Sequence, residues 1–241
     1  MNIFMNTYTR TILVPLFALC VAGLVTTPVQ AQSVDFGADI VNRYVWRGTD
    51  FGNAAAIQPD LSFSSGGFTI GSWGSFEISP TGGNAVNEHD LYASYAFETS
   101  SGTFSIGVTD YYFPSPSNDY FDYEGDGEGA HTIEPNVSYS GPISLYAAIN
   151  AYGRTENEIW LEASVPFSVQ DVDLSLALGG TPNDEVGFYG TDASTDAAIT
   201  KLSLSASKSV EITDSFSLPL MISYYLNPYE EQSFFIFGVS L

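Results

Sequence analysis

The feature that most constrains the fold of this chain is a period of two in its hydrophobicity, which recurs from residue 34 to the last residue. Such alternation gives a β-strand one apolar and one polar face, whereas an amphipathic helix repeats about every 3.6 residues. No segment after residue 31 shows a convincing helical period, so the pattern predicts an all-β fold. In the first segment one face carries Val34, Phe36, Ala38, Ile40, Tyr44 and Trp46.

Twelve segments carry the alternation, and no linker rich in Pro or Gly divides them, so we expect one domain. Pro219 lies in the middle of the eleventh segment, where its missing N–H interrupts a hydrogen-bond ladder, and we expect a β-bulge near it. In the tenth segment, Thr200 and Lys208 fall on the apolar face. The twelve expected strands are 34–46, 57–63, 68–78, 91–97, 104–108, 133–139, 143–149, 159–165, 172–178, 202–206, 216–224 and 235–241.

The first 31 residues have the form of a secretory signal peptide. Arg10 provides the positive region, 11–25 is an apolar stretch shorter than a membrane-spanning helix, and Val29-Gln30-Ala31 offers small residues for cleavage after Ala31. The alternative is an uncleaved anchor helix. Cys20 is the only cysteine, so a mature domain of residues 32–241 has no disulfide and no thiolate nucleophile.

The charge of the chain excludes several classes of function. It has 28 Asp and Glu residues against 6 Lys and Arg, a formal net charge of -22, which disfavours nucleic acid as a partner. It is also 44% hydrophobic and 15% aromatic, which is too apolar for a self-repelling disordered chain.

Alternation alone would also fit a soluble periplasmic β-sandwich, but the connections favour a membrane barrel. Three of them, 64–67, 99–102 and 140–142, are short, and they alternate along the chain with the long segments 79–88, 114–130 and 179–195. Outer-membrane barrels have an even number of strands, short periplasmic turns and long external loops. We therefore expect a transmembrane antiparallel up-and-down β-barrel of about twelve strands, with both termini in the periplasm of a Gram-negative bacterium.

Aromatic residues on the apolar face fall at two levels, as in the girdles at the two lipid interfaces. The last strand alternates to the final residue, like the terminal signal that the barrel-assembly machinery reads, although Leu241 replaces the usual aromatic residue. Outer-membrane lipid, lipopolysaccharide and this machinery are the expected partners. The expected girdle residues are Tyr44, Trp46, Phe63, Phe68, Phe76, Phe97, Phe104, Tyr112 and Tyr139.

The polar faces of the strands would line the lumen of such a barrel. Because most of their charges are acidic, we expect a narrow pore for small cationic or neutral solutes. The alternatives are a lumen closed by ion pairs of Arg43 and Arg47 with carboxylates, or a structural or adhesive barrel that acts through its external loops. The expected lumen residues are Asp35, Asp39, Arg43, Arg47, Asp60, Glu77, Asp90, Glu98, Glu134, Glu158, Glu162, Asp173 and Lys201.

Other chemistry has weaker support in the sequence. Asp122, Glu124 and Asp126 resemble the start of an EF-hand loop and could hold a divalent cation, but Ile133 stands where the closing Glu belongs, and a solvated loop is the alternative. His89 and His131 are the only histidines, and no serine lies in a nucleophile motif. We therefore expect no cofactor and no enzyme, although a lipid hydrolase using a Ser–His pair remains an alternative.

The segment from Asp39 to Thr49, with its Arg43-Tyr-Val-Trp-Arg47-Gly48 core, and the later Ala56-Ile-Gln-Pro59 resemble the start of the TorF-like porins, a family of conserved hypothetical bacterial proteins. The later alternation is similar too, so the likeness spans the mature chain, although only its first thirty or so residues are specific. The resemblance implies an outer-membrane barrel with a pore, and it brings no catalytic residue to this sequence.

Overall fold

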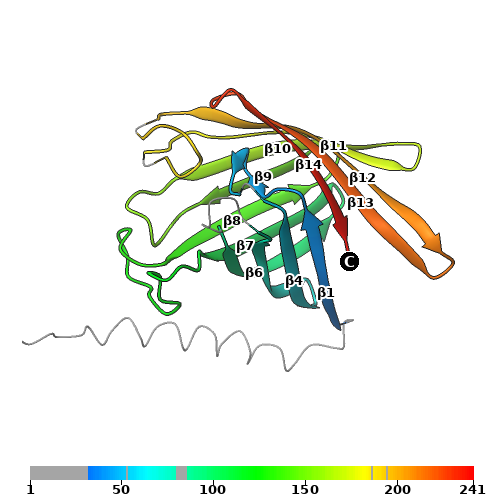
Figure 1. The fold of residues 1–241 in the computed structure, drawn as a ribbon, viewed down its shortest axis with the longest axis horizontal. Helices are drawn as coiled ribbons and strands as arrows, with labels where there is room; N and C mark the ends of the chain where they lie inside the picture. The colour runs from blue at the N-terminus through cyan, green and yellow to red at the C-terminus, as the bar shows by residue number, and fades with distance from the viewer. Residues whose placement is uncertain (1–31, 53, 80–85, 186, 194) are drawn as a thin grey trace, which may run out of the picture. The chain divides into compact units, whose positions relative to one another are not determined.

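The computed structural model describes residues 32–52, 54–79, 86–185, 187–193 and 195–241. The expected signal peptide, residues 1–31, therefore lies outside the described residues. Within the described part, twelve strands form one closed antiparallel barrel and two short strands form a separate hairpin (Figure 1). The expected fold class, an all-β barrel of about twelve strands, is confirmed.

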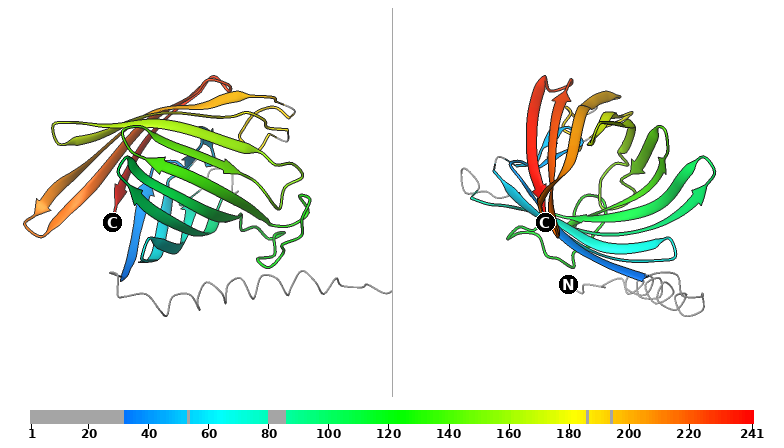
Figure 2. Two further views of the ribbon diagram at one scale, coloured as in Figure 1. Left: turned by 180° about the vertical axis from the view of Figure 1, so that it is seen from behind. Right: turned by 90° about the vertical axis from the view of Figure 1, so that its right-hand side faces the viewer.

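The barrel strands follow the twelve alternating segments closely. The order around the barrel is β1-β14-β13-β12-β11-β10-β9-β8-β7-β6-β5-β4, so successive strands in the chain are neighbours and β1 closes the ring. In Figure 2 the sheet curves round on itself. The barrel strands are β1 (Gln32–Val41), β4 (Ala56–Ser65), β5 (Phe68–Glu77), β6 (Glu88–Thr99), β7 (Gly102–Tyr112), β8 (His131–Ser140), β9 (Ser144–Ile149), β10 (Ile159–Val169), β11 (Val172–Thr181), β12 (Ala198–Thr213), β13 (Phe216–Asn227) and β14 (Gln232–Ser240).

The connections divide the barrel into two different ends. The short-turn end carries the turns 66–67, 100–101, 141–143, 170–171 and 214–215. The other end, which we call the long-loop end, carries 42–55, 78–87, 113–130, 150–158 and 182–197 together with the short turn 228–231. In Figure 1 the loops 113–130 and 182–197 lie on the left, and the β10–β11 and β12–β13 turns lie on the right. This alternation of loop length is the one expected from the sequence.

The outer surface of the barrel is apolar. Large side chains on the outward positions are exposed on every barrel strand, among them Phe36 at 80%, Leu176 at 57% and Phe235 at 58%. A water-soluble protein would bury such side chains, whereas lipid hydrocarbon favours them. A closed barrel also pairs all of its strands, which leaves no sheet edge to the hydrocarbon. The fold is thus that of an outer-membrane-type β-barrel.

No helix in the described ranges is long and apolar enough to span a membrane.

The first alternating segment is shorter than expected. β1 ends at Val41, and the chain then turns into the hairpin of β2 (Val45–Trp46) and β3 (Thr49–Asp50). Arg47 and Gly48 form its two-residue turn with φ of 53° and 86°, and a turn of this kind requires positive φ at both positions. The assignment of Tyr44 and Trp46 to a lipid-facing girdle is therefore wrong, because neither residue lies in the barrel wall.

The assignment of Thr200 to the lipid face is also wrong. Gly179 pairs with Lys201 but Gly180 pairs with Ile199, so Thr200 is an extra residue that forms a β-bulge in β12. A bulge turns the side chain at that point away from the regular alternation. The Thr200 side chain is fully buried inside the barrel.

The prolines lie where the ladder can tolerate a missing N–H. Pro219 pairs with Ser209 in β12, but the β13–β14 ladder ends at Leu220, so no β14 residue stands opposite it. The irregularity in this hairpin lies nearer the turn, between Glu211 and Thr213, rather than at Pro219. A second register change lies beside Pro135, because the β8–β9 ladder stops at Asn136 and resumes with an isolated bridge at Ile133.

Candidate functional site

Residues 42–52, which we call the plug, lie inside the barrel at its long-loop end. The Tyr44 ring lies 5.5 Å from that of Trp73 in β5, and the Arg47 side chain reaches Glu134 in β8. On the far wall, the Thr200 hydroxyl of β12 donates to the Arg47 carbonyl at 3.0 Å. A segment that touches strands on opposite sides of a closed ring must lie in its lumen.

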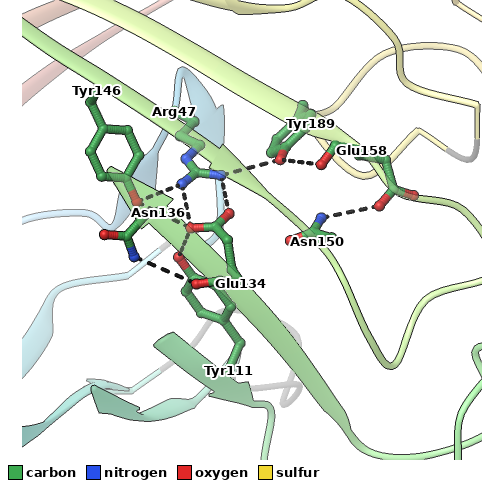
Figure 3. A network of polar contacts seen from close by, with 8 residues as sticks. All are labelled: Arg47, Tyr111, Glu134, Asn136, Tyr146, Asn150, Glu158 and Tyr189. Carbon is green, nitrogen blue, oxygen red and sulfur yellow. Dashed lines mark hydrogen bonds and ion pairs between the residues drawn. The ribbon is translucent and has the colours of Figure 1, made fainter. Parts of the chain in front are cut away.

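Arg47 and Glu134 form the central contact of the plug (Figure 3). The guanidinium donates from Nη1 to Oε2 at 2.7 Å and from Nη2 to Oε1 at 2.8 Å, which is a bidentate pair. Arg47 is only 8% exposed and Glu134 is fully buried. Removing one partner of such a pair leaves an uncompensated buried charge and costs about 3–5 kcal/mol.

Tyrosine hydroxyls complete the network around this ion pair. Tyr111 and Tyr146 donate to Glu134 Oε1 at 2.9 and 3.2 Å, and Tyr189 accepts from Arg47 Nη1 at 3.3 Å. Burial by itself would lower the pKa of Arg47, but its hydrogen bonds to Glu134 and the charges of Glu134 and the nearby tyrosines together outweigh burial and raise the pKa above its ordinary value. Arg47 therefore stays charged at every physiological pH, and the plug contact does not switch off by losing its proton.

Aromatic rings surround the guanidinium. Its Cζ lies 4.3 Å from the centre of the Trp46 ring and 5.2 Å from that of Trp160, and Tyr189 follows at 5.4 Å. Trp160, Tyr189 and Ala148 form a buried cluster on which Trp46 packs. Cation–π contacts that are shielded from water are each worth about 2 kcal/mol. The plug is thus held by both charge and packing.

The backbone of the plug tip is fixed to the opposite wall. The Asn227 side chain of β13 donates to the Gly48 carbonyl at 3.1 Å. A Cβ at Gly48 would lie 1.8 Å from the Thr200 carbonyl oxygen, so only glycine fits this approach. Its positive φ adds a second reason for glycine.

The base of the hairpin is more loosely held. Arg43 and Asp50 approach at 3.5 Å, and both side chains are partly exposed, so this pair contributes about 0–1 kcal/mol. Burial raises the pKa of the Asp50 carboxyl, and the Arg43 charge opposes that rise.

The loop 182–197 covers the plug from the long-loop end. Its Asp184 accepts the backbone N–H groups of Phe188 at 2.6 Å and Tyr189 at 2.9 Å, and the Thr191 hydroxyl at 2.8 Å. Three donors satisfy this buried carboxylate without a basic partner. They fix Tyr189 against the plug, where its carbonyl accepts the Thr49 hydroxyl at 3.1 Å.

Below the plug, the lumen is lined by small polar residues. Ser62, Ser94, Ser105, Ser138, Ser164, Ser175 and Ser205 face inward by the strand alternation. A cavity of about 180 Å³ lies there between β8, β9 and β10, beside Glu162. Among the expected lumen charges, Lys201 binds Glu162 at 2.8 Å and Tyr92 donates to Asp60 at 2.9 Å.

The other expected lumen residues lie near the rims and make local contacts. Ser240 donates to Asp39 at 2.6 Å, Thr103 to Glu98 at 2.9 Å and Ser168 to Asp173 at 2.7 Å. Asp35 accepts the Ser33 hydroxyl at 3.0 Å, and Glu77 accepts the N–H of Val86 at 2.8 Å. Glu158 is buried and accepts from Asn150 at 3.1 Å, whereas Asp90 is buried with an unpartnered oxygen.

The acidic loop does not assemble a metal site. Among the residues that the structure describes, no three His, Cys, Asp or Glu side chains gather closely enough to hold a metal ion. The structure therefore does not bring Asp122, Glu124 and Asp126 together. Asp122 instead accepts a hydrogen bond from the backbone N–H of Glu124 at 3.2 Å.

Both histidines lie at the long-loop end. His131 contacts Asp110 through Nδ1 at 2.8 Å and the Tyr120 carbonyl through Nε2 at 2.7 Å. Its ring stacks on Tyr123 with centroids 3.8 Å apart. On the outer face, His89 Nε2 lies 2.9 Å from the Ser72 hydroxyl, without an acidic residue to orient it.

The remaining expected girdle residues lie in barrel strands. Phe97, Phe104 and Tyr139 form a continuous row near the short turns, with centroids 5.7 and 4.8 Å apart. Phe63, Phe68 and Phe76 lie on the outward positions of β4 and β5. Tyr112 also lies on an outward position, but its ring is buried because Tyr120 of the loop 113–130 covers it.

An apolar groove of about 870 Å³ crosses the outer wall from β7 to β12. Outward side chains such as Ile106, Val137 and Leu161 line it. It belongs to the surface that meets lipid, and we assign no ligand to it.

Sequence comparisons place the chain in a family. Residues 26–218 match the model of a family described as bacterial protein of unknown function (Gcw_chp). The chain belongs to this family. None of the curated proteins matches the sequence of this Gcw_chp protein. A search of solved structures found the translocator domain of the autotransporter NalP from Neisseria meningitidis, with 10% identity, a TM-score of 0.39, and coverage of 96% of this chain and 94% of that one. So loose a superposition carries no information about function.

Some functional residues of this Gcw_chp protein were not singled out from its sequence. Tyr111, Tyr146, Trp160 and Tyr189 enclose the Arg47–Glu134 pair, and Asp184 fixes the covering loop. Strand alternation could have placed the first three on inward faces. Alternation does not predict how far along the lumen each residue lies, so their meeting with Arg47 required the structure.

Proposed function

We propose that this protein is an outer-membrane channel for small cationic or neutral solutes, whose long-loop mouth is narrowed by the plug. The long loops face outward and both termini face the periplasm, as the loop lengths indicate. Lipid and lipopolysaccharide contact the outer wall, and the barrel-assembly machinery inserts it. We further propose that the protein has no enzymatic activity and that it is a TorF-like porin.

The observation that carries the proposal is a polar lumen with a plug at one end only. Serine and glycine line the short-turn half, where they leave room for water. At the other end the tip of the plug is a short hairpin with one buried ion pair, and its base is only weakly paired. A restriction of this kind limits the flow of solute without filling the barrel.

The acidic lumen favours cations. Of the charged residues facing it, Asp39, Asp60, Asp90 and Glu98 have no basic partner among the five described lysines and arginines. Acidic walls in a low-dielectric surround concentrate cations and repel anions.

A second candidate function is a plugged adhesive barrel that acts through its external loops. The observation in its favour is the loop 113–130, where Phe121 is 86% exposed beside Tyr120. A large exposed ring on an external loop is typical of a binding surface. The test is a variant that lacks residues 116–128. If it no longer binds cells or a surface but conducts as the unaltered protein does, the result favours this second function.

The channel proposal is tested in planar lipid bilayers. The purified protein should give small conductance steps. Under a gradient of KCl, the sign of the reversal potential should show that K⁺ permeates better than Cl⁻. The absence of steps, or a preference for anions, would contradict the proposal. The control for lumen charge is the double variant Lys201→Met, Glu162→Gln. It removes one positive and one negative charge, so the net charge of the lumen is unchanged.

A further inference from the structure

The basic residues that the structure describes are all paired with carboxylates. Of its 6 Lys and Arg residues, Arg10 lies outside the described residues. The other five each face one acidic partner, in the pairs Arg43–Asp50, Arg47–Glu134, Arg154–Glu158, Lys201–Glu162 and Lys208–Asp171. Any other buried carboxylate must find its compensation elsewhere.

Glu88 and Asp90 are two such carboxylates. They lie two residues apart on the inward face of β6, opposite Ser75 and Trp73 of β5. Glu88 is 2% exposed and Asp90 is 5% exposed. Glu88 Oε2 and Asp90 Oδ1 are fully buried and have no hydrogen-bond partner among the residues that the structure describes. Each of the two carboxylates thus keeps one unpartnered oxygen in the same stretch of the lumen wall, across from Trp73, on which Tyr44 of the plug packs.

The other fully buried carboxylates in the described chain are compensated by protein groups. Glu134 has Arg47 and two tyrosines, and Asp184 has two backbone N–H groups and a hydroxyl. Glu158 has Asn150 and lies 4.0 Å from Arg154. An isolated buried charge is too costly to persist, so Glu88 and Asp90 need either a bound cation or a shared proton.

We propose that Glu88 and Asp90 bind one alkali-metal cation, Na⁺ or K⁺, at the edge of the plug. Carboxylate oxygens are suitable ligands for hard cations, and paired acids are typical of cation channels. The described part of the chain brings no third acidic residue to the pair, so a tightly chelated divalent ion is not indicated. The Tyr44 ring of the plug packs on Trp73, which is the direct partner of Asp90.

Asp60 would receive the cation on the side that faces the short-turn end of the lumen. It pairs with Trp73, and Trp73 pairs with Asp90, so Asp60 and Asp90 lie in one row across β4, β5 and β6. The Tyr92 side chain passes over Gly71 to reach Asp60, and a Cβ at Gly71 would clash with its ring and hydroxyl. This inference deepens the proposed function, because it names the point at which a permeating cation dwells.

The test is the thermal unfolding of the purified protein in detergent, in NaCl, KCl or choline chloride at equal ionic strength and at one pH. The alkali salts should raise the unfolding midpoint by about 3–6 °C for each tenfold gain in the folding equilibrium constant. In the double variant Glu88→Gln, Asp90→Asn this difference between salts should disappear. In choline chloride the unfolding midpoint of the double variant should be higher than that of the unaltered protein. The control, Glu98→Gln at the rim, should keep the difference.

Equal midpoints in all three salts would overturn the site. A midpoint that changes with pH but not with the cation would also overturn it, because that result indicates a proton shared by the two carboxylates. Bilayer recordings separate this result from the proposed function. If the alkali salts stabilise the protein but it does not conduct, the cation site is supported and the channel proposal is contradicted. If the protein conducts but the alkali salts do not stabilise it, the channel proposal is supported and the cation site is contradicted.

Discussion

At the scale of the residue, Arg47 carries the largest share of the contacts that hold the plug. It makes a bidentate ion pair, donates to two tyrosines and lies against three aromatic rings. Substitution of Arg47 should therefore affect the plug before it affects the barrel wall.

We predict that Arg47→Met costs about 3–5 kcal/mol of plug stability, because it leaves the Glu134 charge buried without its partner. The double variant Arg47→Met, Glu134→Gln should recover much of that loss, since no charge is then left uncompensated. Tryptophan fluorescence during urea titration measures the effect, because Trp46, Trp73 and Trp160 all lie at the plug. Equal losses in the single and double variants would contradict the role given to the ion pair.

Gly48 tests the fit of the plug tip. Gly48→Ala places a Cβ within 1.8 Å of the Thr200 carbonyl and should displace the tip. Gly127→Ala is the matched control, because Gly127 also has positive φ, of 78°, but its Cβ would meet only the Thr155 methyl at 3.0 Å. The control should lose about 1 kcal/mol from its backbone conformation. Gly48→Ala should lose clearly more in the same urea titration.

The sequence predicts the face of a residue better than its partners. Arg43 and Arg47 were expected on the lumen face, with ion pairs to carboxylates only as an alternative, and the structure pairs both with carboxylates. Glu88 was not singled out, although it lies two residues before Asp90 on the same face. The period of two determines inside or outside, whereas partners across the lumen depend on strand stagger, which the sequence does not show.

At the scale of the element, the largest difference between expectation and structure is the end of the first strand. The alternation runs through Tyr44 and Trp46 because the plug is itself a β-hairpin, so its period matches that of the wall. The signal that could have ended the strand is Arg47-Gly48, whose glycine permits a two-residue turn. The bulge in β12 has a weaker signal, since Thr200 falls on the apolar face of its segment, whereas the register change beside Pro135 has none in the pattern of hydrophobicity.

The loop 113–130 is fastened to the rim by His131, and we predict that His131→Ala frees it. The substitution removes two hydrogen bonds and the stacking with Tyr112 and Tyr123. Loss of about 1–3 kcal/mol would raise the open population of the loop by roughly 5-fold to 150-fold. Limited proteolysis should then cut within 113–130 faster, while His89→Ala should leave the rate unchanged. Unchanged cleavage in His131→Ala would show that other contacts hold the loop.

At the scale of the whole molecule, the protein is apolar outside and polar inside. Twelve strands, closure and the two unlike ends were all predicted from the sequence, because strand period and loop length are local properties. The plug is a property of the whole molecule, since it depends on residues from β5 to β13 meeting one segment.

The outward face can be tested directly. Leu204 is exposed on the outer wall, with Leu176 and Tyr224 as its neighbours, whereas the adjacent Ser205 faces the lumen and accepts from Ser223. Leu204→Arg should destabilise the protein in lipid vesicles by about 2–4 kcal/mol, the cost of arginine near the bilayer midplane. Ser205→Arg should cost less, because its charge enters water. Urea unfolding of the two variants in the same vesicles measures the difference, and the reverse order would contradict a membrane-embedded wall.

The most direct test of a lumen narrowed at one end by residues 42–52 is the conductance of a protein that lacks the tip of the plug. Residues 45–50 can be replaced by two glycines, because the N–H of Phe51 already donates to the Tyr44 carbonyl at 2.9 Å. In planar bilayers this variant should give steps several times larger than those of the unaltered protein, with the same cation preference. Steps of equal size in the two proteins would show that the plug does not restrict the lumen.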